Sequence, residues 1–359
     1  MIRDNYYNLL DLFDKFIRDS VSGRRLQRNG KRLRKETIQN YRYLQRLLID
    51  FSVRKEFPLR IRNAVKLSKK EYAMERKYWK RFYREFTGYL YRDLDCFDNY
   101  VGSNMRMIRA FFNYLAIDLG LQIGTFHKNF YIAKEEIPIV VLSPEQLNFL
   151  IFDKVFESLL TEHLRKTKDI FVFGCTVALR VSDLMQLKLY NLEIIDEHYY
   201  LKVISKKTQS QTRIRLPEHA IEIINRYRDK QRTLLPQISL FNLNNNIRQL
   251  METAGWTGPC IKSRSKQGKI ITIPKNSSPG QAYRFCDLVS SHTMRRTAIT
   301  TMLRLGMPEH LVRKISGHSA GSKEFFRYVA LSQLYIDSET EIMFNKFHQK
   351  SMSGIQKIA

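Results

Sequence analysis

Cysteine is scarce in this sequence, and its few positions form no recognisable pattern. The four cysteines are far apart, have no paired spacing and have few histidines nearby: Cys96, Cys175, Cys260 and Cys286. A disulfide framework and a structural zinc site both need closely spaced ligands. The sequence therefore predicts reduced, buried thiols and no metal site.

Long apolar runs are also missing. Nowhere do about 18 uncharged apolar residues follow one another, which is what a membrane-spanning helix needs. A secretory signal has an apolar stretch that ends in small residues. The first residues, MIRDNYYNLLDLFDKF, contain early acids and no such stretch. We therefore expect no membrane partner and take the cytoplasm as the default location.

Glycine and proline are few, with 15 and 9 residues in a chain of 359. Hydrophobic residues make up 43% and aromatic residues 12%, so the composition is not that of a disordered tail. It indicates a folded, helix-rich protein. The length is too great for one ordinary core and predicts about two domains.

Acidic residues are outnumbered, with 35 Asp and Glu against 61 Lys and Arg, and the formal net charge is +26. The excess is divided evenly, at roughly +13 on each side of Ser143, so it is not a local basic tail. A charge this large exceeds what solubility needs and indicates a polyanionic partner. We expect that partner to be double-stranded DNA.

Residues 1–123 are predicted to form a helical DNA-binding domain. Seven of the twelve residues in segment 24–35 are basic, and the following helical stripes bury apolar residues while leaving arginines on the other face. A solvated helix face would give the same pattern. The candidates for DNA contact are Arg24, Arg25, Arg28, Lys31, Arg32, Arg34, Arg42, Arg46, Arg106 and Arg109. Residues 124–142 lack helical period and are predicted to be a linker.

A second domain is predicted over residues 143–336, with a tail at 337–359. Ser143, followed by Pro144 and Gln146, has the pattern of a helix start with a capping box. Segments 198–205 and 212–217 alternate apolar and polar residues and predict a β-hairpin in a mostly helical domain. Residues 255–281, which include the basic insertion from Trp256 to Lys275, are predicted to be loop. The fold class is thus mainly α with a small sheet.

Three short segments of this second domain carry residues suited to phosphate chemistry. Arg180 is followed three positions on by Asp183, which is close enough in sequence to orient a guanidinium. His292 and Arg295 would project from one face of a helix start, where backbone N–H groups favour anions. Gly317 can end a helix and expose His318, with Tyr328 ten residues further on. Each segment alone could be structural.

Together the segments resemble the tyrosine recombinase family of the phage-integrase type. The resemblance rests on the order Arg, Lys, His-x-x-Arg, Gly-His, Tyr, and it covers residues from about 143 to 335 in the expected helix and hairpin contexts. The preceding helical region is similar, with weaker motifs, to the core-binding domain of that family. The resemblance implies a mixed α/β catalytic domain of the tyrosine recombinase type.

The resemblance also implies a role for each matched residue. Arg180 and Arg295 would clamp the non-bridging oxygens of the scissile phosphate, and His292 and His318 would complete the pocket. Lys207 would protonate the departing 5′ oxygen, and Tyr328 would form a 3′-phosphotyrosyl link. These residue types suit the chemistry, because arginines act where charge develops and a phenol needs activation by its neighbours. No cofactor is implied.

Two assignments leave alternatives open. Lys206 adjoins Lys207 in the hairpin, and we favour Lys207 because only one of two successive strand residues faces a given side. The interval from His318 to Tyr328 is one residue longer than the common family spacing, which leaves Tyr335 as a remote alternative nucleophile. The basic insertion has no role that the sequence reveals.

The expected function is site-specific recombination of DNA, for integration and excision or for inversion of a mobile element. The resemblance implies a tetramer on two DNA sites, a monomer or weak dimer in solution, and accessory DNA-bending proteins. The tail, with Ile342, Met343 and Phe347 at helical spacing, would pack on a neighbouring subunit or on its own domain. The alternatives are a type IB topoisomerase and a DNA-binding regulator that has lost cleavage.

Overall fold

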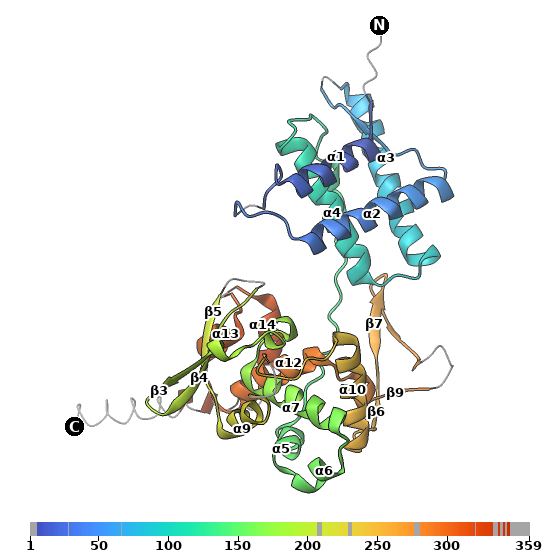
Figure 1. The fold of residues 1–359 in the computed structure, drawn as a ribbon. Helices are drawn as coiled ribbons and strands as arrows, with labels where there is room; N and C mark the ends of the chain where they lie inside the picture. The colour runs from blue at the N-terminus through green and yellow to red at the C-terminus, as the bar shows by residue number, and fades with distance from the viewer. Residues whose placement is uncertain are drawn as a thin grey trace, which may run out of the picture. The chain divides into compact units, whose positions relative to one another are not determined.

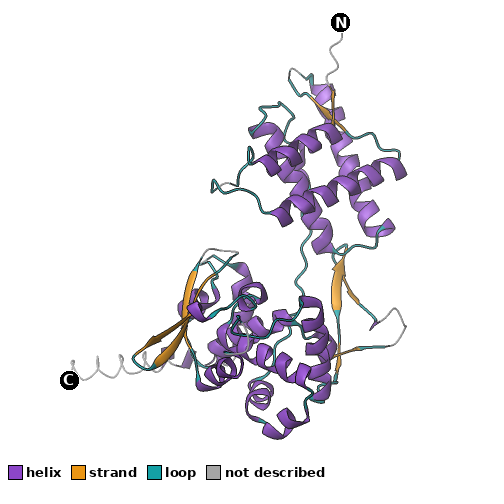
Figure 2. Ribbon diagram, in the orientation of Figure 1, coloured by secondary structure: helices purple, strands orange, loops and turns teal. Residues whose placement is uncertain are grey.

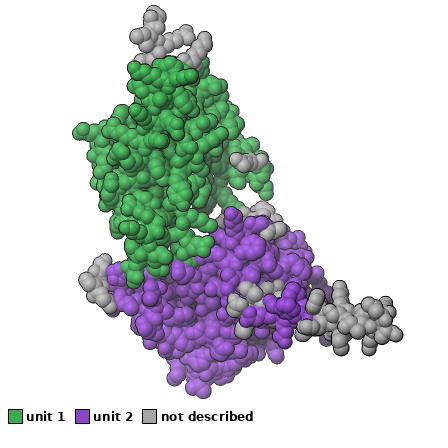
Figure 3. Space-filling view, turned by 180° about the vertical axis from the view of Figure 1, so that it is seen from behind, with its two compact units in different colours: residues 1–137, 263–273 green, residues 138–262, 274–359 purple. Residues whose placement is uncertain are grey.

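The computed structural model describes residues 6–27, 29–65, 67–206, 210–228, 232–275, 281–319 and 321–332, together with 337, 340, 341, 343 and 344. The chain forms two compact units, residues 1–137 with 263–273 and residues 138–262 with 274–359 (Figure 3). Helices dominate and the strands are short (Figure 2), which confirms the predicted fold class. In the described ranges, no helix is both long and apolar enough to cross a bilayer.

Long amphipathic helices build the first unit (Figure 1): α1 (Leu9–Ser22), α2 (Lys35–Arg54), α3 (Lys69–Gly88) and α4 (Asp98–Ile117). The unit also contains short elements: β1 (Tyr6–Asn8), β2 (Arg60–Arg62), the π-helical turn η1 (Tyr89–Asp93) and the 3-10 turn η2 (Phe126–Asn129). Their apolar faces meet in a core rich in aromatic rings, where Phe82 stacks on Phe86 and Trp79 meets Phe112 edge to face. Burial of these faces is the main force that holds the unit together.

The predicted linker at residues 124–142 differs from the structure. Phe126 and Phe130 are buried in the aromatic core of the first unit, and the second unit begins only at Pro138. The segment, which lies wholly in a described range, does lack an α-helix, as its missing helical period indicated. The missing period does not imply an exposed linker, because a 3-10 turn can bury aromatic residues without it.

The prediction of a loop over residues 255–281 was wrong for its central part. Strands β7 (Ser263–Lys266) and β8 (Lys269–Thr272) pair as an antiparallel hairpin. The two turn residues, Gln267 and Gly268, both have positive φ, as a tight two-residue hairpin turn requires. This hairpin belongs to the first unit, where Arg264 pairs with the buried Glu135 and the buried Asp98 accepts from Ser265 Oγ at 2.6 Å.

Helix α7 (Glu162–Val177) is central to the second unit and packs against α5 (Pro144–Phe152), α9 (Glu218–Tyr227), α10 (Leu240–Thr253) and α12 (Ser291–Arg304). Helices α13 (Glu309–Ser316) and α14 (Lys323–Leu331) pack against α12, and the unit also contains the short helices α6 (Lys154–Leu159), α8 (Val181–Leu184) and α11 (Phe285–Leu288). Its main sheet has the order β3 (Leu192–Ile195), β4 (His198–Ile204) and β5 (Gln211–Arg215), entered through the 3-10 turn η3 (Leu189–Asn191). A minor pair joins β6 (Pro259–Cys260) to β9 (Tyr283–Arg284). The predicted hairpin is β4 with β5, whereas β3 was not predicted.

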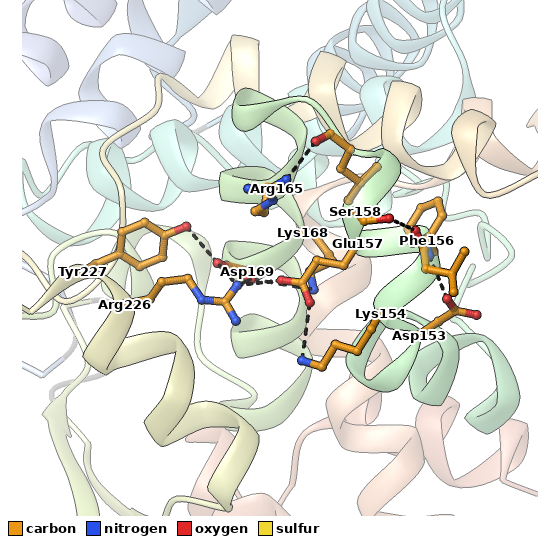
Figure 4. A network of polar contacts seen from close by, with 12 residues as sticks. Asp153, Lys154, Phe156, Glu157, Ser158, Arg165, Lys168, Asp169, Arg226 and Tyr227 are labelled. Atoms are coloured by element: carbon orange, nitrogen blue, oxygen red, sulfur yellow. Dashed lines mark hydrogen bonds and ion pairs between the residues drawn. The ribbon is translucent and has the colours of Figure 1, made fainter.

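A buried polar network fixes α7 in place (Figure 4). Asp169 on α7 is fully buried and accepts hydrogen bonds from Tyr227 at 2.7 Å and Arg226 at 3.0 Å, both on α9. Lys168, also buried, pairs with Glu157 of α6 at 3.2 Å. Burial raises the pKa of Asp169, so these partners are what keep a charge there tolerable. The network anchors the helix that leads into the functional site.

Candidate active site

Arg180 stands at a sharp turn between two helices. Helix α7 ends at Val177, and Ala178 adopts the left-handed conformation with φ of 54°, which costs a non-glycine residue about 1–2 kcal/mol. The turn makes Arg180 the residue that precedes α8. Its Nη1 donates to Ser205 Oγ at 3.1 Å, and Ser205 Oγ in turn donates to Asp183 Oδ2 at 3.1 Å. Asp183 therefore orients the guanidinium through a serine.

Arg295 is buried between two backbone carbonyls. Helix α12 approaches α7 closely at Gly174, where an added Cβ would lie 2.6 Å from the sulfur of Met294. Arg295 Nη1 donates to the Ala178 carbonyl at 2.9 Å, and Nη2 donates to the Ser316 carbonyl at 2.6 Å. Burial, followed by repulsion from Arg180, lowers the pKa of Arg295 to about 10. The two guanidinium groups thus form a site where a bound anion would reduce the repulsion between them.

His318 is held beside Arg295 by the end of α13. Gly317 takes the left-handed conformation with φ of 62°, which ends the helix, and the His318 ring comes within 3.4 Å of Arg295 Nη2. Ser316 Oγ donates to the Val312 carbonyl at 2.6 Å and lies 2.8 Å from His318 Nδ1. A hydroxyl has one hydrogen, so while Ser316 donates to the carbonyl, Nδ1 donates to Ser316 Oγ and Nε2 is the acceptor.

Tyr328 packs against the His318 ring. It lies on α14, is 9% exposed, and its ring centroid is 5.9 Å from that of His318. Phe325, one turn earlier, packs on both rings and belongs to the same small apolar cluster. The charge of a Tyr328 phenolate would raise the pKa of Arg295, so the two groups are close enough to interact electrostatically.

The remaining two matched positions are His292 and Lys207. His292 is exposed at the start of α12, whereas Arg295, three residues later, is buried. The two side chains therefore lie in different environments, although we expected both on one face of the helix. Lys207 lies outside the described residues. Lys206 is in the turn beyond β4, which ends at Ile204, so the alternation of a strand cannot decide between the two lysines.

The candidate DNA contacts of the first unit divide into two groups. Most are exposed: Arg24, Lys31, Arg32, Arg34, Arg42, Arg46 and Arg106. Arg109, which we expected to be free, donates instead to the carbonyls of His127 and Lys128. Arg25 lies over the Phe16 ring at 4.4 Å, so part of the basic segment packs on the core. Arg28 lies outside the described residues.

The tail prediction mostly concerns residues that are not described. Ile342 and Phe347 fall outside the described residues, as does the alternative nucleophile Tyr335. Met343 is described and is exposed. Packing of the tail on a neighbouring subunit or on its own domain stays a prediction.

Sequence reasoning missed Ser205 and Ser316, although each contacts a predicted site residue. Ser316 has a local signal, because it stands two positions before His318 and at the end of a helix. Ser205 has none, because its partners lie 22 and 25 positions away in the chain. Within the described ranges, no group of three or more His, Cys, Asp or Glu side chains could hold a metal ion.

The environment of His318 predicts a pH-dependent stability. Burial, followed by repulsion from Arg295 and Arg180, lowers its pKa to about 4, against about 6.5 in an unfolded chain. Between about pH 4 and 6.5 the unfolded state binds more protons than the folded state. The free energy of unfolding therefore falls as the pH is lowered through this window. Because the ring is partly exposed, solvent screening reduces this effect. Wild type should lose on the order of 1 kcal/mol from this residue between pH 7 and 5, measured by denaturant unfolding.

The matched variants are His318→Gln and His310→Gln, because His310 is an exposed histidine on α13 of the same unit. The first should reduce the loss of stability between pH 7 and 5, and the second should leave it unchanged. An identical loss in His318→Gln and wild type would contradict the burial argument.

A family model describes the second unit. The model of the phage integrase family matches residues 154–334, half of the chain, and this range contains Arg180, Lys207, His292, Arg295, His318 and Tyr328. No curated protein sequence matches the chain.

Solved structures share the fold at low sequence identity. The XerH site-specific recombinase, bound to palindromic difH substrate in a post-cleavage complex, has a TM-score of 0.59 and 12% identity, covering 93% of this chain and 96% of that one. The Tn1549 transposon integrase with a circular intermediate DNA has a TM-score of 0.57 and 16% identity, covering 94% and 99%. A lambda integrase dimer on a COC′ core site has a TM-score of 0.50 and 14% identity, covering 90% and 78%. With half of its length matched by the family model, the chain belongs to the phage integrase family and is a tyrosine site-specific recombinase.

Proposed function

We propose that Arg180, Arg295, His318 and Tyr328 form the catalytic centre of this recombinase, together with His292 and a lysine of the β4–β5 hairpin. The observation that carries the proposal is the convergence of residues from separate helices on one spot. Arg295 contacts the Ala178 turn, the Ser316 carbonyl and the His318 ring, and Tyr328 packs on that ring. Arg180 is close enough to Arg295 to lower its pKa by repulsion, and Asp183 reaches Arg180 through the Ser205 hydroxyl. Two neighbouring cations favour an anionic ligand.

The chemistry follows from this arrangement. The Tyr328 oxygen attacks the phosphorus, an oxygen–phosphorus bond forms, and the bond to the 5′ oxygen breaks. The phenol gives its proton to a histidine of the pocket, His318 or His292, and Lys207, or its neighbour Lys206, gives a proton to the leaving oxygen. The guanidinium groups of Arg180 and Arg295 donate hydrogen bonds where negative charge develops. A 5′-hydroxyl from another strand reverses the step, because the 3′-phosphotyrosyl bond conserves the energy of the original ester.

Double-stranded DNA is the proposed partner. The net charge of +26 and the exposed arginines on α2 and α4 support binding to a polyanion. The solved relatives named above are complexes with DNA. We further propose integration and excision, or inversion, of a mobile element in the cytoplasm. A tetramer would act on two sites, with accessory bending proteins, and the free protein would be a monomer or weak dimer.

The test uses the full chain and a nicked duplex built from the DNA that flanks its gene, where an attachment site is expected. A protein–DNA adduct that survives detergent, followed by joining to a second duplex, supports the proposal. Relaxation of supercoiled plasmids without this sequence, and without joining, would instead indicate a type IB topoisomerase. Sequence-specific binding without an adduct would indicate a regulator that has lost cleavage.

The exposed basic segment leads to a prediction about salt. Replacing Lys31, Arg32 and Arg34 by glutamine should weaken binding to every DNA sequence alike. It should also lower the slope of log K against log salt by up to about 2.7, at about 0.9 per phosphate contact. The measurement is fluorescence anisotropy with labelled duplex at several salt concentrations.

The matched control replaces Arg76, Lys77 and Lys80, three exposed basic residues of α3, with the same change of charge. Its slope should change less. Equal slopes in the two variants would show a general effect of net charge and would contradict a DNA contact by the segment.

A further inference from the structure

Ser205 lies between two charged groups of the candidate active site. It directly follows β4 and is 6% exposed. Its hydroxyl accepts a hydrogen bond from Arg180 Nη1 at 3.1 Å and donates one to Asp183 Oδ2 at 3.1 Å. A hydroxyl has one donor hydrogen and two acceptor lone pairs, so it makes both bonds at once. The serine is therefore a polar bridge between guanidinium and carboxylate.

The carboxylate of Asp183 also holds the backbone of the hairpin. Its second oxygen, Oδ1, accepts from the N–H of Lys206 at 3.2 Å, and the residue is 5% exposed. The N–H of Ser205 donates to the carbonyl of Ser210 at 2.9 Å, which closes the hairpin below its tip. Asp183 thus fixes the place where the chain leaves β4 and enters the turn at Lys206.

The bridge also affects how many donors Arg180 can offer. A guanidinium has five N–H donors, and a direct fork-like pair with a carboxylate would use two of them. Ser205 uses one donor and brings a neutral acceptor instead of a charge. The arginine is oriented in this way without a direct ion pair that would compete with a phosphate.

We propose that Ser205 is a positioning residue that couples Arg180 to the lysine-bearing tip of the β4–β5 hairpin. The serine acts through these two groups and is not a catalytic residue itself. The inference rests on the proposed function, because it assumes that Arg180 binds the scissile phosphate and that a hairpin lysine protonates the leaving oxygen. Loss of the hydroxyl should loosen both groups together.

The first experiment compares Ser205→Ala, Ser205→Thr and wild type in single-turnover cleavage of the nicked duplex at saturating protein. Ser205→Ala should be slower by roughly 10- to 100-fold, the cost of displacing a reacting group by about 1 Å. Ser205→Thr keeps the hydroxyl and should recover most of the rate. Ser158→Ala removes an exposed serine of α6 in the same unit and should cleave like wild type.

The second experiment uses two modified phosphates, because a purely structural defect would not respond to them. A bridging sulfur at the 5′ position leaves as a thiolate and needs no acid, so it bypasses the hairpin lysine. A methylphosphonate has a methyl group in place of one non-bridging oxygen and is neutral, so its cleavage depends less on Arg180. If Ser205 positions both groups, the defect of Ser205→Ala relative to wild type should shrink on each substrate.

The outcomes separate this inference from the proposed function. An adduct with wild type, a slow Ser205→Ala and a smaller defect on both modified substrates support the coupling. Wild-type cleavage by Ser205→Ala overturns it, as does a defect that both substrates leave unchanged or that only one relieves. The coupling is also overturned if weaker DNA binding by Ser205→Ala accounts for its whole cleavage defect. Failure of wild type to form any adduct would count against the proposed function instead.

Discussion

Tyr328→Phe is expected to abolish the covalent adduct with DNA and to leave DNA binding intact. The change removes only the oxygen that would attack phosphorus, whereas the ring keeps its packing on His318 and Phe325. Without the phenol oxygen no covalent intermediate can form, so the loss should reach the detection limit of the assay. Incubation with the nicked duplex, followed by denaturing electrophoresis, measures the adduct.

Tyr335→Phe is the control for the nucleophile, because Tyr335 is the alternative left by the sequence. It should form the adduct like wild type. Mass spectrometry of the peptide attached to DNA identifies the tyrosine directly. An adduct in Tyr328→Phe that disappears in Tyr335→Phe would show that the assignment is wrong, and an adduct in both single variants would show that either phenol can reach the phosphate.

Local patterns of the sequence predicted the elements that carry the site. Ser143 and Gln146 do form the expected capping box at the start of α5. The alternating segments are the paired strands β4 and β5. Both features depend on side chains within a few positions of one another, and short-range hydrogen bonding and pleating determine them. Such features are the part of a fold that a single sequence reveals most directly.

Contacts between distant segments could not be predicted in the same way. Helical period places Arg109 on the outer face of α4, but it cannot show that residues 127 and 128 return there with their carbonyls. Ser205 meets Arg180 only because the hairpin folds back onto the turn after α7. The hairpin at 263–273 had one local signal, the Gln267–Gly268 turn, but nothing in its strands indicates that it joins the first unit.

Arg295→Lys is expected to reduce cleavage at saturating DNA by roughly 10²- to 10³-fold. An ammonium carries its donors on one nitrogen, so it cannot reproduce the fork that reaches both the Ala178 and Ser316 carbonyls. The lysine also lacks the guanidinium N–H groups that would donate hydrogen bonds to the phosphate oxygens as negative charge develops on them. An unsatisfied buried carbonyl costs about 1–3 kcal/mol, so the variant should also be less stable.

Stability and chemistry can be separated with Arg304→Lys, a matched change on the last turn of the same helix. Arg304 donates to the Leu331 carbonyl at 3.4 Å and lies outside the cluster around His318, so this control should cleave like wild type. Cleavage by Arg295→Lys should stay low at temperatures well below its own unfolding transition. If its rate approaches that of wild type once the protein is folded, then Arg295 is a structural clamp for the turn at Ala178, and the phosphate must be held by other groups.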